Sequence, residues 1–398
     1  MSTKRFLAVT ISLLVVLSGC GDGSRNGGDD LEDPRPISVE LEAELEGWLS
    51  EHGSEPCEYV IGLFADHDVV LLGEQHRIRH DALFVQELLP RVHAAGVTVF
   101  ATEFARREDQ RLLDSLVVDT AWREDLGREI IFRQFMPWGY REYVDILKAV
   151  WKVNLDRPRG SAPIRVLGLN NSYDYTHFRS ESDWDDPEIW KLVTAGQTEE
   201  DWAEPVLDAV RGGAKVLLHS GIHHAFTGYV QPRVQDAKFL GVGQKRLGNF
   251  IREALGSRAV TVFLHAPWNG PVGYNADFVH PADGRLDAFM LSRTDGPFPV
   301  GFDVEGSPLA DLHIEEAVYK HGHEPFTLSG FCDGWIYTKP VSEYEPVTYI
   351  EDWIDDANLS RARMNAMNPR WRDFSVDEMH EGCKSYMEDF RRFFGRLR

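Results

Sequence analysis

Short apolar runs that alternate with amphipathic stretches are the feature that most restricts how this chain folds. The first run, residues 68–73 (DVVLLG), has the near-continuous apolar character of a strand that is buried on both faces of a sheet. Residues 80–95 follow it with apolar side chains at helical spacing. Further strands are expected at 97–101, 164–169, 215–218 and 259–264, with weaker candidates at 300–304 and 335–338, and helices at about 107–117, 121–135, 140–153, 200–211 and 245–255.

This order of elements predicts an α/β fold. Strand–helix–strand units have right-handed crossovers, so that successive strands lie parallel in one sheet and helices cover both of its faces. We therefore expect a mainly parallel central sheet flanked by helices, in a single large domain with helical insertions. The stretch 174–204, which is rich in Asp, Trp and Ser, is expected to be such an insertion or a lid.

The N-terminal segment has the character of a targeting signal rather than of a folded domain. Lys4 and Arg5 precede an apolar run over 6–17, which is short for a membrane-spanning helix and typical of a secretory signal. The sequence LSGC that ends at Cys20 resembles the bacterial lipobox. That resemblance implies cleavage before Cys20 and lipid attachment to it; an ordinary signal peptide with a chance cysteine is the alternative.

These features divide the chain into four parts. We expect a lipoprotein signal peptide over 1–19, a flexible tether over 20–36, the α/β domain over 37–373 and a C-terminal amphipathic helix over 374–398. The protein is accordingly expected in the bacterial cell envelope. Lipid at Cys20 would anchor it to a membrane surface, on the outer membrane or facing the periplasm.

Charge and cysteine content exclude some partners and scaffolds. The chain has 42 Lys and Arg against 64 Asp and Glu, a net charge of −22, and phosphate binding needs clustered basic side chains, so no nucleic acid partner is expected. Cys57, Cys332 and Cys383 remain after Cys20, so that at most one disulfide forms, and the spacing leaves its pairing open. The oligomeric state is left open as well.

Polar side chains gather where the predicted strands end. Glu74 and His76 follow the first strand, and Glu103 follows the second. The histidines that follow the fourth and fifth strands are His219, His223, His224 and His265. Because ligands of parallel α/β sheets bind beyond the carboxyl ends of the strands, we expect these side chains to converge on one pocket.

Imidazole and carboxylate groups together suit two kinds of chemistry. They bind divalent ions such as manganese, cobalt, zinc or iron. Without a metal, a histidine serves as general base and a carboxylate orients it. The spacing does not separate these two interpretations. The sequence has no G-x-S-x-G, HExxH, GxGxxG or P-loop motif that would indicate a different chemistry.

Two G-x-x-H segments, 73–76 and 221–224, with Glu103 between them, carry a family resemblance. The pattern resembles the superfamily that joins Tiki metalloproteases, erythromycin esterases, TraB/GumN proteins and ChaN-type haem-binding lipoproteins. Segments 143–170, 302–309 and 333–337 add to the resemblance, which covers roughly 66–354. It implies an α/β fold. In the Tiki branch it implies a divalent metal and peptide hydrolysis, in the esterase branch a histidine base, and in the ChaN branch haem.

Residues and resemblance together lead to one functional hypothesis and two alternatives. We expect a membrane-tethered extracytoplasmic hydrolase, dependent on Mn, Co or Zn, that cleaves an amide or ester bond of a small-molecule or peptide substrate. The alternatives are a haem- or iron-binding lipoprotein without catalysis and an inactive scaffold.

The hypothesis assigns a role to each candidate residue. The expected catalytic residues are Glu74, His76, Glu103 and His224. The expected metal ligands are His76, Glu103, His219 and His224. Glu103 or Glu74 would accept the proton of the attacking water, and His219 and His223 would support the ligands. Arg106 or Arg107 would stabilise an oxyanion or a substrate carboxylate.

Overall fold

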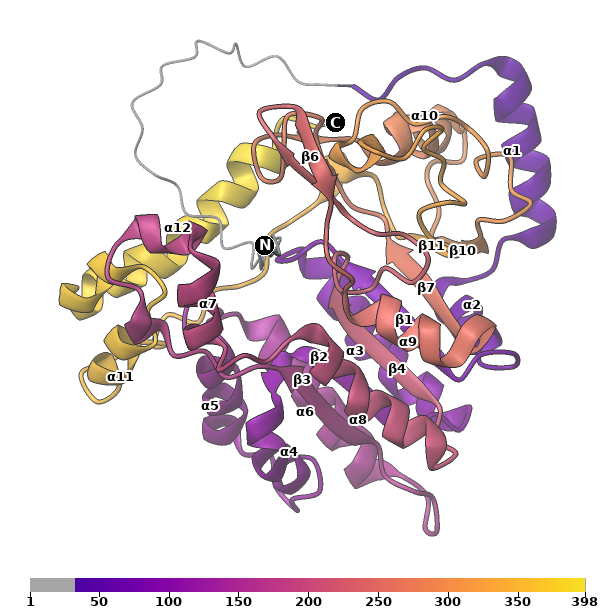
Figure 1. Cartoon of the computed structure of the whole chain (residues 1–398). Coiled ribbons are helices and arrows are strands. Elements are labelled where there is room, and N and C mark those ends of the chain that lie inside the picture. The colour runs from indigo at the N-terminus through magenta and orange to yellow at the C-terminus, as the bar shows by residue number, and fades with distance from the viewer. Residues whose placement is uncertain (1–32, 398) are drawn as a thin grey trace, which may run out of the picture.

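The computed structural model describes residues 33–397, and its centre is a seven-stranded sheet (Figure 1). The strands lie in the order β10-β11-β7-β1-β4-β2-β3, and every neighbouring pair is parallel except β10 with β11. Their bounds are β1 (Val69–Glu74), β2 (Val99–Arg106), β3 (Arg165–Asn170), β4 (Val216–Gly221), β7 (Ala259–Leu264), β10 (Val300–Asp303) and β11 (Gly334–Tyr337). The predicted mainly parallel α/β fold is confirmed.

Helices lie on both faces of this sheet (Figure 1). The helices of the described residues are α1 (Val39–His52), α2 (Pro56–Leu63), α3 (Arg79–Ala94), α4 (Gln110–Leu116), α5 (Glu124–Gln134), α6 (Arg141–Asp156), α7 (Pro187–Val193), α8 (Glu199–Arg211), α9 (Leu247–Leu255), α10 (Arg285–Ser292), α11 (Leu359–Met364) and α12 (Val376–Phe394). Every strand and helix expected for the α/β core has a counterpart at nearly the predicted position.

Alternate residues of the central strands belong to two separate hydrophobic clusters. In β1, Val70 and Leu72 lie in a cluster with side chains of α3 and α6. Val69 and Leu71 point the other way and join a cluster with side chains of α8 and α9. Because both faces of β1 are covered, its sequence is an unbroken apolar run rather than an alternating one.

Two strands extend beyond their predicted ends. β2 runs to Arg106 instead of residue 101, and β4 runs to Gly221 instead of residue 218. Glu103 and His219 therefore lie inside strands, where polar residues are unusual. The Asn170 side chain donates a hydrogen bond to the Glu103 carbonyl at 3.0 Å, and the register of β2 against β3 shifts between Thr102 and Arg106. Glu103 lies within this irregular stretch of β2, and its side chain lines the cavity at the end of the sheet.

The segment 174–204 is an insertion at the end of the sheet, as expected. It contains two short 3-10 helices and α7 before α8 begins. Two small hairpins, β5 (Pro232–Gln235) with β6 (Lys238–Val242) and β8 (Trp268–Asn269) with β9 (Phe278–Val279), lie outside the main sheet and were not predicted.

The C-terminal helix α12 is integrated into the core. Ser375 and Glu378 form a capping box at its start. Met379 and Cys383 on its inner face are fully buried in the same cluster as α3 and α6. Its amphipathic pattern therefore reflects packing on the domain. Ala362 of α11 belongs to the same cluster, and both helices are drawn in yellow in Figure 1.

The expected signal peptide over 1–19, the lipid anchor Cys20 and most of the tether over 20–36 lie outside the described residues. Across the part of the chain that the structure covers, no helix combines the length and the apolar character that crossing a membrane requires. Cys57, Cys332 and Cys383 are all buried and all free.

Candidate active site

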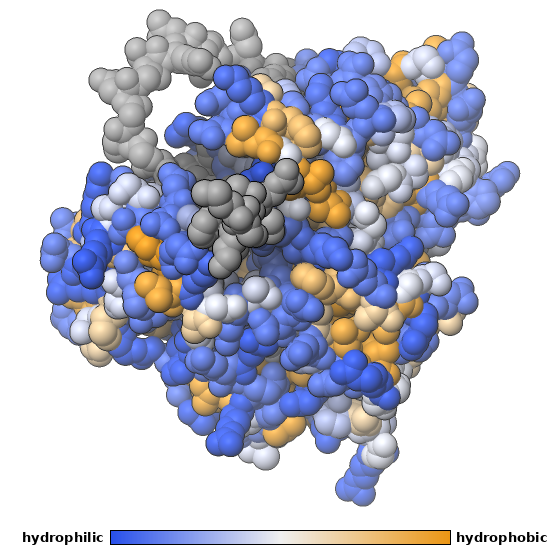
Figure 2. Space-filling view, viewed as in Figure 1, coloured by the Kyte–Doolittle hydropathy of each residue, from blue (hydrophilic) through white to orange (hydrophobic). Residues whose placement is uncertain are grey.

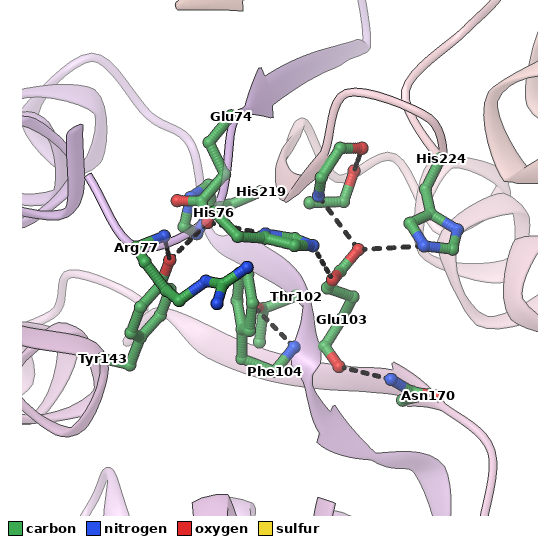
Figure 3. Close-up of polar contacts among 12 residues, drawn as sticks. Glu74, His76, Arg77, Thr102, Glu103, Phe104, Tyr143, Asn170, His219 and His224 are labelled. Carbon is green, nitrogen blue, oxygen red and sulfur yellow. Dashed lines mark hydrogen bonds and ion pairs between the residues drawn. The ribbon is translucent and has the colours of Figure 1, made fainter. Parts of the chain in front are cut away.

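Glu74 is the buried centre of a polar cluster at the end of β1 (Figure 3). Its carboxylate accepts hydrogen bonds from His76 Nδ1 at 3.0 Å, His219 Nε2 at 2.8 Å and the Tyr143 hydroxyl at 2.5 Å. Burial raises the pKa of Glu74, but His219 and His76 more than offset this effect, and the pKa falls to about 2. Glu74 is therefore a carboxylate that only accepts, and it fixes His76 with its proton on Nδ1.

His76 and His224 face one carboxylate from two sides (Figure 3). His76 Nε2 lies 3.4 Å from Glu103 Oε1, and His224 Nε2 lies 3.4 Å from Glu103 Oε2. The backbone N–H of Gly221 donates to Glu103 Oε2 at 2.9 Å and holds the carboxylate in place. Burial lowers the pKa of His76, but the neighbouring Glu103 and Glu74 outweigh it, so that the pKa of His76 is raised above its ordinary value.

Glu199, the first residue of α8, holds His224 as Glu74 holds His76. His224 Nδ1 donates to Glu199 Oε2 at 2.8 Å, and the N–H of Leu247 donates to the same oxygen at 2.9 Å. Arg246 forms an ion pair with Glu199 at 2.7 Å. Burial raises the pKa of Glu199, but Arg246 and His224 more than offset this and lower it to about 2. His76 and His224 thus each donate from Nδ1 to a carboxylate that stays ionised at neutral pH.

These groups line one cavity of about 110 Å³ at the carboxyl ends of the strands. All four predicted catalytic residues, Glu74, His76, Glu103 and His224, are in its wall, so the structure brings them together. The aromatic residues that complete the wall are Phe104, Phe135, Trp138, Tyr173, Tyr175 and Trp202. Tyr173 and Tyr175 belong to or adjoin the insertion that the sequence indicated.

Two further predicted histidines lie next to the cavity in different positions. His219 is completely buried behind Glu74 and does not line the cavity, so it orients Glu74 and is not placed as a metal ligand. His223 does line the cavity, with its Nε2 2.9 Å from the Tyr319 hydroxyl, and burial lowers the pKa of His223 well below its ordinary value.

Three other predicted residues lie outside the cavity. His265 is buried beyond the end of β7, where its Nε2 lies 3.1 Å from Asp287. Arg106 is paired with Asp109 at 2.6 Å, and Arg107 donates to the carbonyl of Asp201 at 2.6 Å. The expectation that His265 joins the site and that Arg106 or Arg107 stabilises an oxyanion is therefore wrong. The arginines in the cavity wall are instead Arg77 and Arg246.

Three important contributors were missed from the sequence. Glu199 lies just before the helix predicted at 200–211, Arg246 lies inside the helix predicted at 245–255, and Tyr143 occupies an apolar position of the helix predicted at 140–153. Glu74 and Tyr143 are 69 positions apart, and Glu199 and His224 are 25 apart. No local pattern marks such partners, because only folding brings them into contact.

The cavity has the types of side chain that bind metal ions, but their ligand atoms lie too far apart to share one ion as they stand. A carboxylate on one ring nitrogen of His76 and of His224 is the arrangement that orients metal-binding histidines. Among the described His, Cys, Asp and Glu side chains, the only group of three whose ligand atoms all lie within 4.8 Å of one another is Glu55, Cys57 and Glu87. Arg91 already pairs with both of those glutamates. Binding one ion through His76, Glu103 and His224 requires these side chains to move closer together.

Comparisons with solved structures support the fold. A Bacillus cereus protein of 12% sequence identity matches with a TM-score of 0.51 over 79% of this chain and 100% of its own. A structure described as a succinoglycan biosynthesis protein, 9% identical, matches with a TM-score of 0.52 over 79% of this chain and 99% of its own. At such identities the likeness shows a shared α/β fold.

A third similarity is more distant. An erythromycin esterase variant in its open conformation, 11% identical, has a TM-score of 0.45 over 73% of this chain and 94% of its own, which is too low to support an inference. No protein-family model matches the sequence, and no curated protein matches it either.

Proposed function

We propose that the chain is a hydrolase that cleaves an ester or amide bond of a small-molecule or peptide substrate in this cavity. One observation carries the proposal. Two imidazoles, each held through Nδ1 by a carboxylate, direct Nε2 at the single carboxylate of Glu103 inside an aromatic-walled cavity. Convergent imidazole and carboxylate groups in a partly enclosed cavity are the parts that general acid–base hydrolysis requires. The resemblance to Tiki- and esterase-type proteins agrees with this proposal.

The proposed mechanism assigns one proton step to each histidine. Glu103 positions a water molecule between the two rings. Neutral His76 accepts the proton of this water at Nε2 as the water attacks the carbonyl carbon, and Glu74 stabilises the imidazolium that forms. His224, protonated at Nε2, donates to the leaving group, and Glu199 stabilises it in the same way.

A divalent ion is the alternative means of activating the water. His76, Glu103 and His224 are the residues that would hold Mn, Co or Zn, and the ion would acidify a bound water molecule. The steps above do not depend on it. Hydrolysis measured with a chelator and with each ion added back separates the two routes. Loss of turnover in chelator and recovery with one ion favours the metal.

The direct test is hydrolysis of a panel of p-nitrophenyl esters and short peptides by the protein and three variants. H76A and H224A are each expected to reduce kcat/KM by at least about 100-fold, in line with the usual contribution of acid–base residues. H52A is the matched control, because His52 is an exposed residue at the end of α1. Equal activity in all three variants would remove the active site from this cavity.

Haem or iron binding without catalysis is the second candidate function. The observation in its favour is the set of His and Tyr side chains in the cavity wall. A cavity of about 110 Å³ is small beside the roughly 300–1,000 Å³ of sites that enclose drug-sized ligands, so a haem would require its walls to open. A stoichiometric Soret band in protein produced with haem, lost in H76A or H224A, would favour this function.

We also propose that the hydrolase is anchored through Cys20 to a membrane surface of the bacterial envelope. The support is the LSGC sequence after a short apolar run. Cys20→Ser is expected to move the protein from the membrane fraction to the soluble fraction or to leave it as an uncleaved precursor. Normal processing and membrane retention of the variant would contradict the anchor.

A further inference from the structure

We infer that Arg77 binds a carboxylate or similar anionic oxygen group that the substrate carries outside the cleaved bond. The preferred substrates of the cavity are therefore anionic esters or amides. The inference rests on the proposed function, since it names the substrate class of the same site. Arg77 follows His76 directly and lines the same cavity (Figure 3). The anionic group would therefore bind next to the bond that is cleaved.

Arg77 is a cation with no acidic partner among the side chains that the structure describes. Its guanidinium lies 6.0 Å from the Trp138 ring and 5.5 Å from the Tyr386 ring, and Nη1 donates to the carbonyl of Tyr386 at 2.9 Å. No described carboxylate forms an ion pair with Arg77, and its buried Nε has no hydrogen-bond partner among the described groups. A guanidinium has five N–H donors, so several remain for a ligand.

The other arginine of the cavity shows the contrast. Arg246 forms an ion pair with Glu199 at 2.7 Å, and its charge is thereby neutralised. The carboxylates of Glu74 and Glu103 face the histidines of the site instead of an arginine. Arg77 is therefore the arginine of the cavity wall for which the structure shows no carboxylate partner. A planar guanidinium matches the two oxygens of a carboxylate, and partial exclusion of water by the aromatic wall strengthens such a pair.

The backbone holds Arg77 in an unusual conformation. Its φ of 71° lies in the left-handed region, which residues other than glycine seldom adopt. The Arg77 N–H donates to the Tyr143 hydroxyl at 3.0 Å, and the Arg77 carbonyl accepts from the Val347 N–H at 3.0 Å. Such strain persists where the surroundings impose it and is concentrated at functional sites. The Tyr143 hydroxyl also donates to Glu74, so the same side chain positions both Arg77 and the catalytic cluster.

A structural role is the competing explanation, because Arg77 also contacts α12 through Tyr386. A purely structural residue would change stability and would lower activity on all substrates equally. A binding residue changes the preference between substrates. The test therefore compares p-nitrophenyl hemiglutarate with p-nitrophenyl valerate, two esters of equal acyl length that differ in one terminal carboxylate.

The wild-type protein is expected to favour the hemiglutarate by at least about 10-fold in kcat/KM. R77Q should reduce this preference by at least about 10-fold. R77K keeps the positive charge but lacks the planar guanidinium, so it should retain part of the preference. R79Q is the matched control, because Arg79 lies outside the cavity wall and is paired with Glu142 and Glu345. The same preference in wild type and R77Q, or no preference in the wild type, would overturn the inference.

A binding measurement separates this inference from the proposed hydrolysis. Free glutarate is expected to raise the melting temperature of the wild type by mass action, and to have no such effect on R77Q. If neither ester is hydrolysed but glutarate stabilises the wild type and not R77Q, the hydrolase proposal fails and the oxyanion site stands. If glutarate leaves the melting temperature of the wild type unchanged, the oxyanion site is excluded.

Discussion

At the scale of single residues, Gly221 shows how closely the cavity is built around its histidine. Gly221 ends β4 beside Glu74 of β1, and its N–H donates to Glu103. A Cβ at this position would lie 2.6 Å from His76 Cε1 and 2.8 Å from His76 Nε2. Absence of a side chain at residue 221 is therefore a condition for the position of the His76 ring.

Gly221→Ala is expected to reduce hydrolytic turnover by at least about 10-fold, because the added methyl group displaces the imidazole that accepts the proton. Steady-state kinetics on the ester panel measures this effect. Gly228→Ala is the matched control, since a Cβ there meets no atom within 4 Å. Equal loss of activity in both variants would show that the effect is general destabilisation.

The pH dependence of activity also belongs to single residues. The general base must be neutral, and the pKa of His76 is raised above its ordinary value by Glu103 and Glu74. We expect kcat/KM to rise with pH through an apparent pKa above about 6.5. In E103Q one of the two carboxylates is neutral, and the same limb should move to lower pH. An unmoved acidic limb in E103Q would show that His76 is not the group that titrates.

At the scale of elements, α8 completes a site that the strands only begin. Its first turn supplies Glu199, which holds His224 and also accepts from the N–H of Leu247 at the start of α9. Its Trp202 ring stacks on His224 with centroids 5.1 Å apart. One helix start therefore sets both the tautomer and the orientation of a catalytic histidine that belongs to another element.

Glu199→Gln is expected to lower kcat by about 10- to 100-fold, the range typical when the group that orients an active-site histidine is lost. The cause is that a neutral amide no longer stabilises His224 when it is protonated. Glu200→Gln is the control, since Glu200 is the next residue of α8 and is exposed. The kinetic constants of both variants decide the outcome, and an unchanged kcat in Glu199→Gln would contradict the assigned role.

At the scale of the whole molecule, burial of the polar network links stability to pH. Glu74, Glu199 and Asp287 have their pKa values lowered to about 2 by histidine or arginine partners that outweigh burial. In the unfolded chain the same groups titrate near 4, so they stabilise the fold above that pH and lose the contribution as pH falls toward 2. His80, whose pKa burial lowers to about 3, acts in the same direction between about 6.5 and 3.

The melting temperature is therefore expected to fall as pH is lowered from about 4 to 3, where the three carboxylates begin to lose their contribution. Glu74→Gln should melt lower at pH 7 and show a shallower slope below pH 4.5, because it no longer has a carboxyl group to protonate. The shift of Glu74 from 4.5 to about 2 corresponds to a contribution on the order of 3 kcal/mol. Calorimetry across this range measures both slopes, and identical slopes would contradict the linkage.

The sequence by itself determined where the strands and helices of the sheet lie and which polar residues stand at the ends of the strands. Apolar runs such as that of β1 predict buried strands because both faces must be covered, and chain order alone then places Glu74, His76, Glu103 and His224 at one edge. These inferences succeed because the period of a strand and the direction of a parallel sheet are local properties.

Only the tertiary structure decided which partners those residues have. His219 and His265 also follow strand positions, yet one lies behind Glu74 and the other pairs with Asp287. Glu199 reaches His224 from the start of α8, and Arg77 has no described carboxylate as a partner. Side-chain partners depend on packing angles and loop paths between distant segments. A contact across 69 positions, such as Tyr143 with Glu74, leaves no periodic trace in the chain.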